Sequence, residues 1–436
     1  MQISSWINFA VKSKKTKGSL VENLIEFGSS FWINFTHNLF KPLLLFFYAG
    51  FLIPIFKIKF EFPPVVYQML TVYLLIAIGW HGGEELALIS PDQFSHIIGF
   101  MALGFCVNLI IGVMAYNILR KATNLRKIDA ATVGAYYGSD SAGTFVTAVG
   151  VVTAANLAFA PFMPVMLAIM EIPGCLMALL LVGMLRKSGM DCAGNMPGEP
   201  GYTKPAHVPE EPVQALGLMP SVAGVSNETL MQFATEASTT LPLKGLAATV
   251  AKWRNSFSKF PIDSKLLQEV FLNPGLYLLF AGIIIGFVSR LQGPDVVKAD
   301  DELLVRLFQA NLCLFLFEMG ITASKRLADV KKVGWRFIAC ALFMPIFFGT
   351  FGITALCMYS HLTQITVEIG TYALFATLCS SASYIAMPAI QRLAIPEASA
   401  TLPLAASLGV TFSFNVTIGI PFYIEIAKKF LASFPL

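Results

Sequence analysis

The stretches Gly138-Ser139-Asp140-Ser141-Ala142-Gly143-Thr144 and Ser380-Ser381-Ala382-Ser383-Tyr384 place small, hydroxyl-rich residues inside otherwise apolar segments of membrane length. Because hydrocarbon offers backbone polar groups no partners, such an interruption is tolerated at membrane depth only where it is buried in protein or lines a wet cavity. The two interruptions occupy matching places in the two halves of the chain. Paired interruptions of this kind are typical of a transporter with a binding site near the bilayer midplane.

The composition supports a membrane protein. Hydrophobic residues make up 56% of the 436 residues, charged residues 13%, and the mean hydropathy is +0.69, whereas a soluble domain carries about 25% charged residues. The chain is long enough for roughly ten spans of about 20 residues. The net charge of +4 is small and scattered, so a nucleic acid partner is not expected. The seven cysteines show no paired spacing, and we expect free thiols.

Apolar runs divide the chain into two sets of five spans, and we expect an all-α polytopic membrane protein. The predicted domains are an amphipathic N-terminal region (1–38), a first five-helix repeat (39–185), a solvent-exposed linker (186–265) and a second five-helix repeat (266–436). The predicted spans cover residues 39–58, 65–82, 94–119, 130–157 and 159–185, then 270–289, 303–322, 335–359, 365–390 and 401–427.

Short matches in the same order relate the two halves. Leu44–Gly50 corresponds to Leu276–Gly282, Ile78-Gly79 to Met319-Gly320, Ser139-x-Ser141 to Ser381-x-Ser383, and Ile172-Pro173 to Ile420-Pro421. Because each repeat has an odd number of spans, the second enters the membrane from the opposite side. The sequence therefore predicts a 5+5 inverted repeat with two broken helices that cross near the midplane.

The distribution of basic residues predicts the orientation. Loops after odd-numbered spans carry 20 of the 30 Lys and Arg residues. The positive-inside rule then places the 186–265 linker in the cytoplasm and both termini outside, in the inner membrane of the cell. The N-terminal cluster of four lysines between Lys12 and Lys17 lies on the side assigned outside, and the amphipathic 1–38 region is interpreted as an interfacial helix or a targeting segment.

The broken helices supply the candidate binding residues for a small anion. Freed backbone N–H groups and the positive ends of half-helices favour negative charge, and hydroxyl groups add donors. Close helix packing is the alternative role for small residues. The candidate substrate-binding residues are Gly138, Ser139, Ser141, Thr144, Ser381 and Ser383.

Few polar groups in the spans could couple transport to an ion. A carboxylate at a helix centre costs about 2.5–3.5 kcal/mol on insertion scales, so Asp140 and Glu171 are candidates for a proton or cation role. Asp140 could instead cap a half-helix. Asn415 could be a neutral ion ligand or an interhelical hydrogen-bonding group. The Tyr384 hydroxyl could donate to Asp140 across the cavity. No spacing typical of a metal site or a catalytic constellation is present, so neither a cofactor, a resident metal nor an enzyme is expected.

The arrangement resembles the sodium-dependent bicarbonate permeases over most of the chain beyond about residue 39. The resemblance rests on Asp129-Ala130 through Gly134, Gly138, Ser141, Thr144, Glu171-Ile172-Pro173, the block from Ser380 through Pro388, Arg392, Ile395-Pro396 and Ile420-Pro421. It implies ten spans in core and gate subdomains, a homotrimer, bicarbonate between the two broken helices and sodium nearby as the coupling ion. A cytosolic PII-like regulator is a further candidate partner.

The sequence departs from the permease pattern in its acids. Glu171 stands where those permeases have an Asp before Ile-Pro, Tyr384 stands where they have an Asp, and Asp140 occupies a position that is usually apolar in them. The negative charge has therefore moved from the second interruption to the first.

These observations predict a secondary active transporter of a small anion, most simply sodium-dependent bicarbonate uptake by an elevator mechanism. Two alternatives stay open. One is a proton-coupled or sodium-coupled carrier of another small anion or carboxylate. The other is a membrane receptor or scaffold that binds a cytosolic regulator through its linker.

Overall fold

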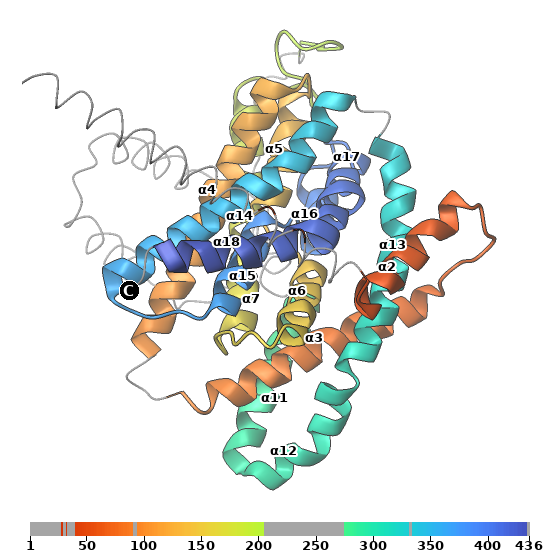
Figure 1. The fold of residues 1–436 in the computed structure, drawn as a ribbon. Helices are drawn as coiled ribbons and strands as arrows, with labels where there is room; N and C mark the ends of the chain where they lie inside the picture. Colours follow the sequence, from red (N-terminus) through yellow and green to blue (C-terminus); the bar gives the residue numbers. More distant parts are fainter. Residues whose placement is uncertain are drawn as a thin grey trace, which may run out of the picture.

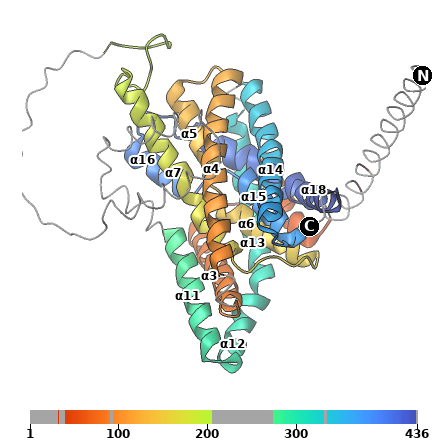
Figure 2. The same ribbon diagram turned by 90° about the vertical axis from the view of Figure 1, so that its left-hand side faces the viewer.

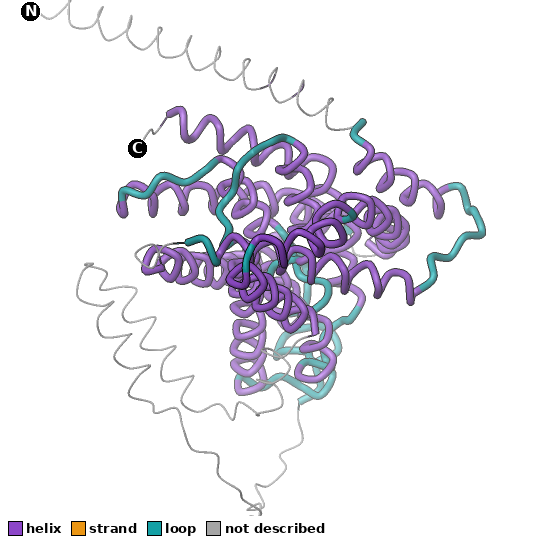
Figure 3. Tube along the Cα trace, turned by 90° about the horizontal axis from the view of Figure 1, so that it is seen from below, coloured by secondary structure: helices purple, strands orange, loops and turns teal. Residues whose placement is uncertain are grey.

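The computed structural model describes residues 40–89, 94–204, 274–330 and 334–433, together with Gly28 and Trp32. These residues form helices and connecting loops, with no strand among them (Figures 1 and 3). Seven of the described helices are long and apolar enough to span a membrane. The protein is therefore an all-helical, multi-pass membrane protein. The predicted amphipathic region of residues 1–38 lies outside the described residues, apart from Gly28 and Trp32, and so does most of the linker.

Six helices are described in the first half. Their bounds are α2 Pro42–Ile55, α3 Pro64–Leu86, α4 Phe94–Ala122, α5 Lys127–Tyr137, α6 Ala142–Ala154 and α7 Met163–Lys187. Proline stands at the start of α2 and α3, where its missing N–H costs no hydrogen bond. The predicted span at 130–157 is therefore two half-helices, α5 and α6, which meet at the first interruption.

The second half also contains long helices and two half-helices. Its elements are α11 Pro274–Gln292, the short α12 Pro294–Asp301, α13 Phe308–Val330, α14 Trp335–Thr363, α15 Ile369–Ser380, α16 Ala386–Ala394, α17 Thr401–Leu404 and α18 Ile420–Ser433, with π-helical turns at Glu302–Arg306, Ala405–Phe412 and Asn415–Gly419. The predicted span at 365–390 is again two half-helices, α15 and α16. From α17 to α18 the chain forms one membrane-length element, Thr401–Ala432.

The helices form two bundles. In the arm bundle, α2 packs mainly against α13 and α3 mainly against α11. The end of this bundle formed by α11, the short α12 and part of α3 extends below the rest of the molecule in two views, while α2 lies at the side in the first (Figures 1 and 2). The core bundle contains α4 to α7 and α14 to α18, which pack on one another around the two broken helices. The bundles meet where α3, α11 and α13 contact α6, α7 and the π-helical segment after α17.

Glycines bring the arm helices into backbone contact. A Cβ at Gly50 would overlap the carbonyl oxygen of Phe317, and one at Gly320 would overlap that of Phe47. In the other helix pair, a Cβ at Gly79 would overlap the carbonyl oxygen of Leu279, and one at Gly282 would overlap that of Ile76. Larger side chains at these four positions would force the helices apart.

Candidate site between the two broken helices

The first interruption ends α5 and starts α6. Residues 138–141 leave the helix, and Ser141 is the N-cap of α6, with its Oγ accepting a hydrogen bond from the Thr144 amide at 3.2 Å. The Thr144 hydroxyl donates to the same oxygen at 2.8 Å. The cap of α6 is therefore Ser141 and not Asp140.

The second interruption lies against the first. The amide of Ser383 donates to the carbonyl oxygens of Tyr136 at 2.8 Å and Ser139 at 3.0 Å. In return, the Ser141 amide donates to Ser381 Oγ at 3.0 Å. The sequence predicted that these stretches meet, and three buried hydrogen bonds join them.

The two broken helices run antiparallel. At one end, the Gly370 amide at the start of α15 donates to the carbonyl of Ala158, just after α6. At the other end, Asp129 lies in the first turn of α5. Its carboxylate accepts a hydrogen bond, 2.9 Å long, from the amide of Ser399, which follows α16. The N-terminal ends of α6 and α16 consequently lie on either side of the joined interruptions.

Gly138 serves close packing. A Cβ there would crowd the Cα atoms of Gly112 on α4 and Gly174 on α7. The first interruption thus contacts α4 and α7 at three glycines, near the middle of both helices.

Asp140 is the most unusual group of the site. It is 1% exposed, and neither of its carboxylate oxygens has a hydrogen-bond partner among the described residues. The fully buried Ser139 Oγ also lacks one. Buried polar atoms are normally hydrogen-bonded, so these atoms have unused capacity for a ligand.

Glu171, on α7, is a second buried acid, 7% exposed. It lies three residues before Gly174, which packs against Ser139, the neighbour of Asp140. Glu171 also lines a small cavity between the bundles, with Leu75 and Leu276 of the arm and Ala142 and Ile385 of the interruptions.

Tyr384 and Asn415 are placed differently from the two acids. The Tyr384 hydroxyl makes no hydrogen bond to Asp140 and lies against Gly143. The Asn415 amide nitrogen donates to the Ser380 carbonyl at 3.1 Å, while its oxygen accepts from Ser380 Oγ and the Tyr423 hydroxyl. Asn415 therefore fastens the end of α15 to the last span, the interhelical role that the sequence left open.

With this geometry in view, the sequence matches a known family. Residues 42–428 match the family model of the Na+-dependent bicarbonate transporter superfamily. The chain belongs to this superfamily. No curated protein matches the sequence. Membership implies sodium and bicarbonate as ligands and a transport role rather than catalysis.

The cavities of this superfamily member that border α6 include one beside the interruptions and one at the far end of the helix. A small one, about 10 Å³ in volume, lies beside the interruptions between Ala142, Gly143 and Ile385 on one side and Thr71, Leu74 and Phe315 of the arm on the other. This volume holds at most about one water molecule. The bundles are therefore tightly closed over the interruptions.

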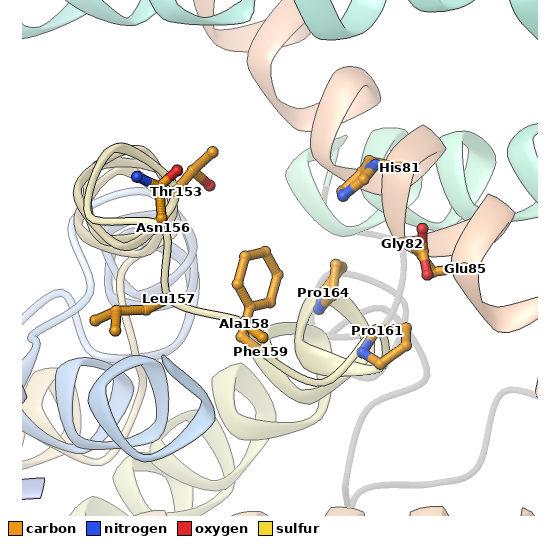
Figure 4. Close-up of a pocket in the computed structure, with 10 residues that line it drawn as sticks. All are labelled: His81, Gly82, Glu85, Thr153, Asn156, Leu157, Ala158, Phe159, Pro161 and Pro164. Atoms are coloured by element: carbon orange, nitrogen blue, oxygen red, sulfur yellow. The ribbon is translucent and has the colours of Figure 1, made fainter. Parts of the chain in front are cut away.

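The other cavity, about 500 Å³ in volume, lies at the far end of α6, with Thr153 and Asn156 on one side and His81 on the other (Figure 4). Thr153 is 12 residues beyond Ser141, which is about 18 Å along a helix. The cavity is thus separate from the joined interruptions.

A polar assembly that was not predicted from the sequence lies at the start of α5 and beyond the end of α16. The residues after α7, at 188–204, fold into a loop that we call the linker clamp; within it, the Asp191 carboxylate accepts from the amides of Thr203, Asn195 and Ala193 at 2.9, 2.7 and 3.0 Å. Glu199 accepts from the amide of Lys127, the first residue of α5, at 2.8 Å. The first part of the predicted linker is therefore ordered protein structure.

Arginines tie the linker clamp to both broken helices. Arg126 pairs with Asp129 at 2.7 Å and donates to the carbonyls of Ala193 in the clamp and Glu397 beyond α16. Arg186 pairs with the Glu397 carboxylate at 2.8 Å. The signal in the sequence was the turn-forming run with Gly189, Gly194, Gly198 and Gly201, all of which have positive φ angles.

Proposed function

We propose that the protein is a secondary active transporter that carries bicarbonate into the cell together with sodium. The observation that carries this proposal is the direct hydrogen bonding between two antiparallel broken helices in a member of a Na+-dependent bicarbonate transporter superfamily. Interrupted helices at a repeat interface are the usual place for substrate and coupling-ion sites in secondary transporters.

The N-terminal ends of α6 and α16 suit a small anion. Each helix end carries partial positive charge and amide donors. Around them lie the candidate substrate residues Gly138, Ser139, Ser141, Thr144, Ser381 and Ser383. Because several of their hydroxyls already shape the interruptions, we propose that they act mainly by holding backbone donors toward the anion.

The contacts support an inverted repeat of about ten spans. The sequence matches relate Gly50 to Gly282 and Gly79 to Gly320. The Gly50 helix crosses the Gly320 helix, and the Gly282 helix crosses the Gly79 helix. Exchanging the two repeats converts one crossing into the other, as a twofold relation requires. The antiparallel broken helices fit the same relation.

The two bundles support an elevator mechanism. We propose that the arm bundle is the fixed gate and that the core bundle carries the site across the membrane. Large apolar side chains of the arm are exposed, such as Val65 at 74% and Tyr277 at 64%, which suits contact with lipid or with neighbouring subunits of a homotrimer. In the orientation we propose, the linker faces the cytoplasm, where a PII-like regulator could bind, the termini face outward, and the 500 Å³ cavity opens on the outer side.

Uptake of labelled bicarbonate into proteoliposomes tests this function. We expect accumulation with an inward sodium gradient and little uptake when choline replaces sodium. Equal uptake under both conditions would contradict sodium coupling, and no uptake of any kind would favour a receptor or scaffold.

The Asp140 carboxylate, which has no hydrogen-bond partner among the described residues, also suits a proton carrier, and we propose proton coupling as the second candidate. In that case a pH gradient would drive uptake without sodium. Replacing the sodium gradient by a pH gradient in the same vesicles separates the two candidates.

A further inference from the structure

Two buried acids and a buried hydroxyl lie where α7 packs against the first interruption, and the hydrogen bonds that join the two interruptions do not use these side chains. We propose that Asp140, Glu171 and Ser139 bind one sodium ion between the first interruption and α7. This inference rests on the proposed sodium-coupled function and assigns the cation to a defined set of atoms.

Unused hydrogen-bonding capacity marks this place. Asp140 and Ser139 are 1% and 0% exposed, and three of their side-chain oxygens have no hydrogen-bond partner among the described residues. Neither Asp140 nor Glu171 takes part in the ion pairs of the described residues. A buried carboxylate without a neutralising partner has a high free-energy cost at membrane depth. A bound cation is the simplest group that would neutralise it.

Helix packing brings the ligands together. A Cβ at Gly174 would overlap the backbone nitrogen and the Cβ of Ser139, so α7 touches the interruption at that point. Glu171 and Cys175 lie three residues before and one after Gly174, on the same side of the helix. The Cys175 thiol donates to the Glu171 carbonyl at 3.5 Å and forms part of the same surface.

The charges favour one monovalent ion. Glu171 shares a small cavity with Ala142, two residues after Asp140, and two buried carboxyl groups at one site are not both ionised without a positive charge between them. Carboxylate and hydroxyl oxygens are hard donors, which suit a hard cation rather than a soft metal. Tyr384 lies against Gly143 and Asn415 is saturated by Ser380 and Tyr423, so neither belongs to this set.

The proposed ion and the anion share one piece of backbone. The Ser139 carbonyl accepts from the Ser383 amide of the second interruption, while its hydroxyl is left for the cation. Sodium binding would therefore fix the shape of the interruption whose Ser141 caps α6. This provides a physical route by which sodium prepares the anion site.

Sodium-dependent thermal stability of the purified, full-length protein tests the site without relying on transport. The melting temperature is measured while NaCl replaces choline chloride at constant ionic strength and pH. A ligand that binds only the folded state raises the melting temperature. We expect Asp140→Asn and Glu171→Gln to raise the sodium concentration at the half-maximal shift by about tenfold or more, as expected for loss of a contact to a charged group, and Ser139→Ala to raise it less.

Glu425→Gln is the matched control, because Glu425 is another buried acid, 6% exposed, that pairs with Lys428. It should leave the sodium midpoint unchanged, and Glu171→Asp should restore part of the response lost in Glu171→Gln. If Asp140→Asn and Glu171→Gln show the wild-type sodium concentration at the half-maximal shift, the proposed sodium site is wrong, even if sodium still drives bicarbonate uptake. A wild-type melting temperature that responds to pH but not to sodium would also overturn it. Loss of the proposed function would be seen separately, as sodium-independent uptake by the wild type.

Discussion

Ser141 has two roles at the residue scale, because the same oxygen caps α6 and borders the proposed anion site. It accepts from both the amide and the hydroxyl of Thr144, while its amide donates to Ser381. A change at Ser141 therefore acts on helix stability and on ligand binding together.

We predict that Ser141→Ala lowers the free energy of unfolding by about 1 kcal/mol, the usual cost of a lost N-cap, and weakens bicarbonate uptake. Thermal unfolding and uptake kinetics measure the two effects. Ser141→Thr, which keeps the hydroxyl, is the control for the cap. Normal stability and normal uptake in Ser141→Ala would contradict both roles.

Gly174 shows how one missing side chain positions a site. We predict that Gly174→Ala destabilises the protein by about 1–3 kcal/mol, because an added methyl group overlaps backbone atoms that cannot move independently. The measurement is the melting temperature. Gly150→Ala is the matched control, because its methyl group would meet the end of the flexible Leu312 side chain. Equal losses in the two variants would mean that backbone contact at Gly174 is not the cause.

At the scale of the elements, the linker clamp acts as an external cap for α5. The Glu199 carboxylate accepts from the Lys127 amide at the helix N-terminus, where negative charge is favourable. We predict that Glu199→Ala lowers the free energy of unfolding by about 0.5–2 kcal/mol and increases amide hydrogen exchange in the first turn of α5. Glu199→Asp, which keeps the negative charge, is the control variant. Unchanged exchange at residues 127–130 would exclude the capping role.

Acid should reduce the contribution of the linker clamp to the stability of the fold. Amide donors from Thr203, Asn195 and Ala193 hold the pKa of Asp191 below its ordinary value of 3.8. A carboxylate with a lowered native pKa stabilises the fold above the ordinary value, and this contribution is lost as the pH falls through the native pKa.

We therefore predict that the melting temperatures of wild type and Asp191→Asn differ above about pH 4, near the ordinary Asp value, and converge below it. Melting curves recorded from about pH 7 to about pH 3, which covers both sides of the ordinary Asp value, measure this difference. A difference that persists unchanged into acid would show that the ionised carboxylate is not the cause.

At the scale of the whole molecule, the elevator proposal requires the core bundle to slide against the arm. Gly150 on α6 faces Leu312 on α13 across this boundary. We predict that a disulfide in the Gly150→Cys, Leu312→Cys double variant arrests bicarbonate uptake and that a reductant restores it, in a background with the exposed Cys106 and Cys192 changed to serine.

Ala160→Cys with Thr371→Cys is the control pair, because the Ala160 amide and the Thr371 hydroxyl are 2.7 Å apart within the core bundle. A disulfide there should not stop transport. Full uptake with the Gly150 to Leu312 link formed would contradict relative movement of the bundles.

The sequence by itself determined the membrane class, most helix positions and the two interruptions. These features depend on local composition, since a span needs about 20 apolar residues and a break at membrane depth needs small polar ones. The similarity between Leu44–Gly50 and Leu276–Gly282 was also visible in the chain, because a match of this kind is local in sequence.

Only the tertiary structure decided the partner of each polar group. It showed that Asn415 is saturated, that Tyr384 does not reach Asp140, and that Ser141 rather than Asp140 caps α6. It also brought the linker clamp, with Glu199, onto the start of α5. Hydrogen bonds between residues distant in sequence depend on how helices cross, and crossings are set by side-chain packing and by glycines such as Gly174, which no local pattern specifies.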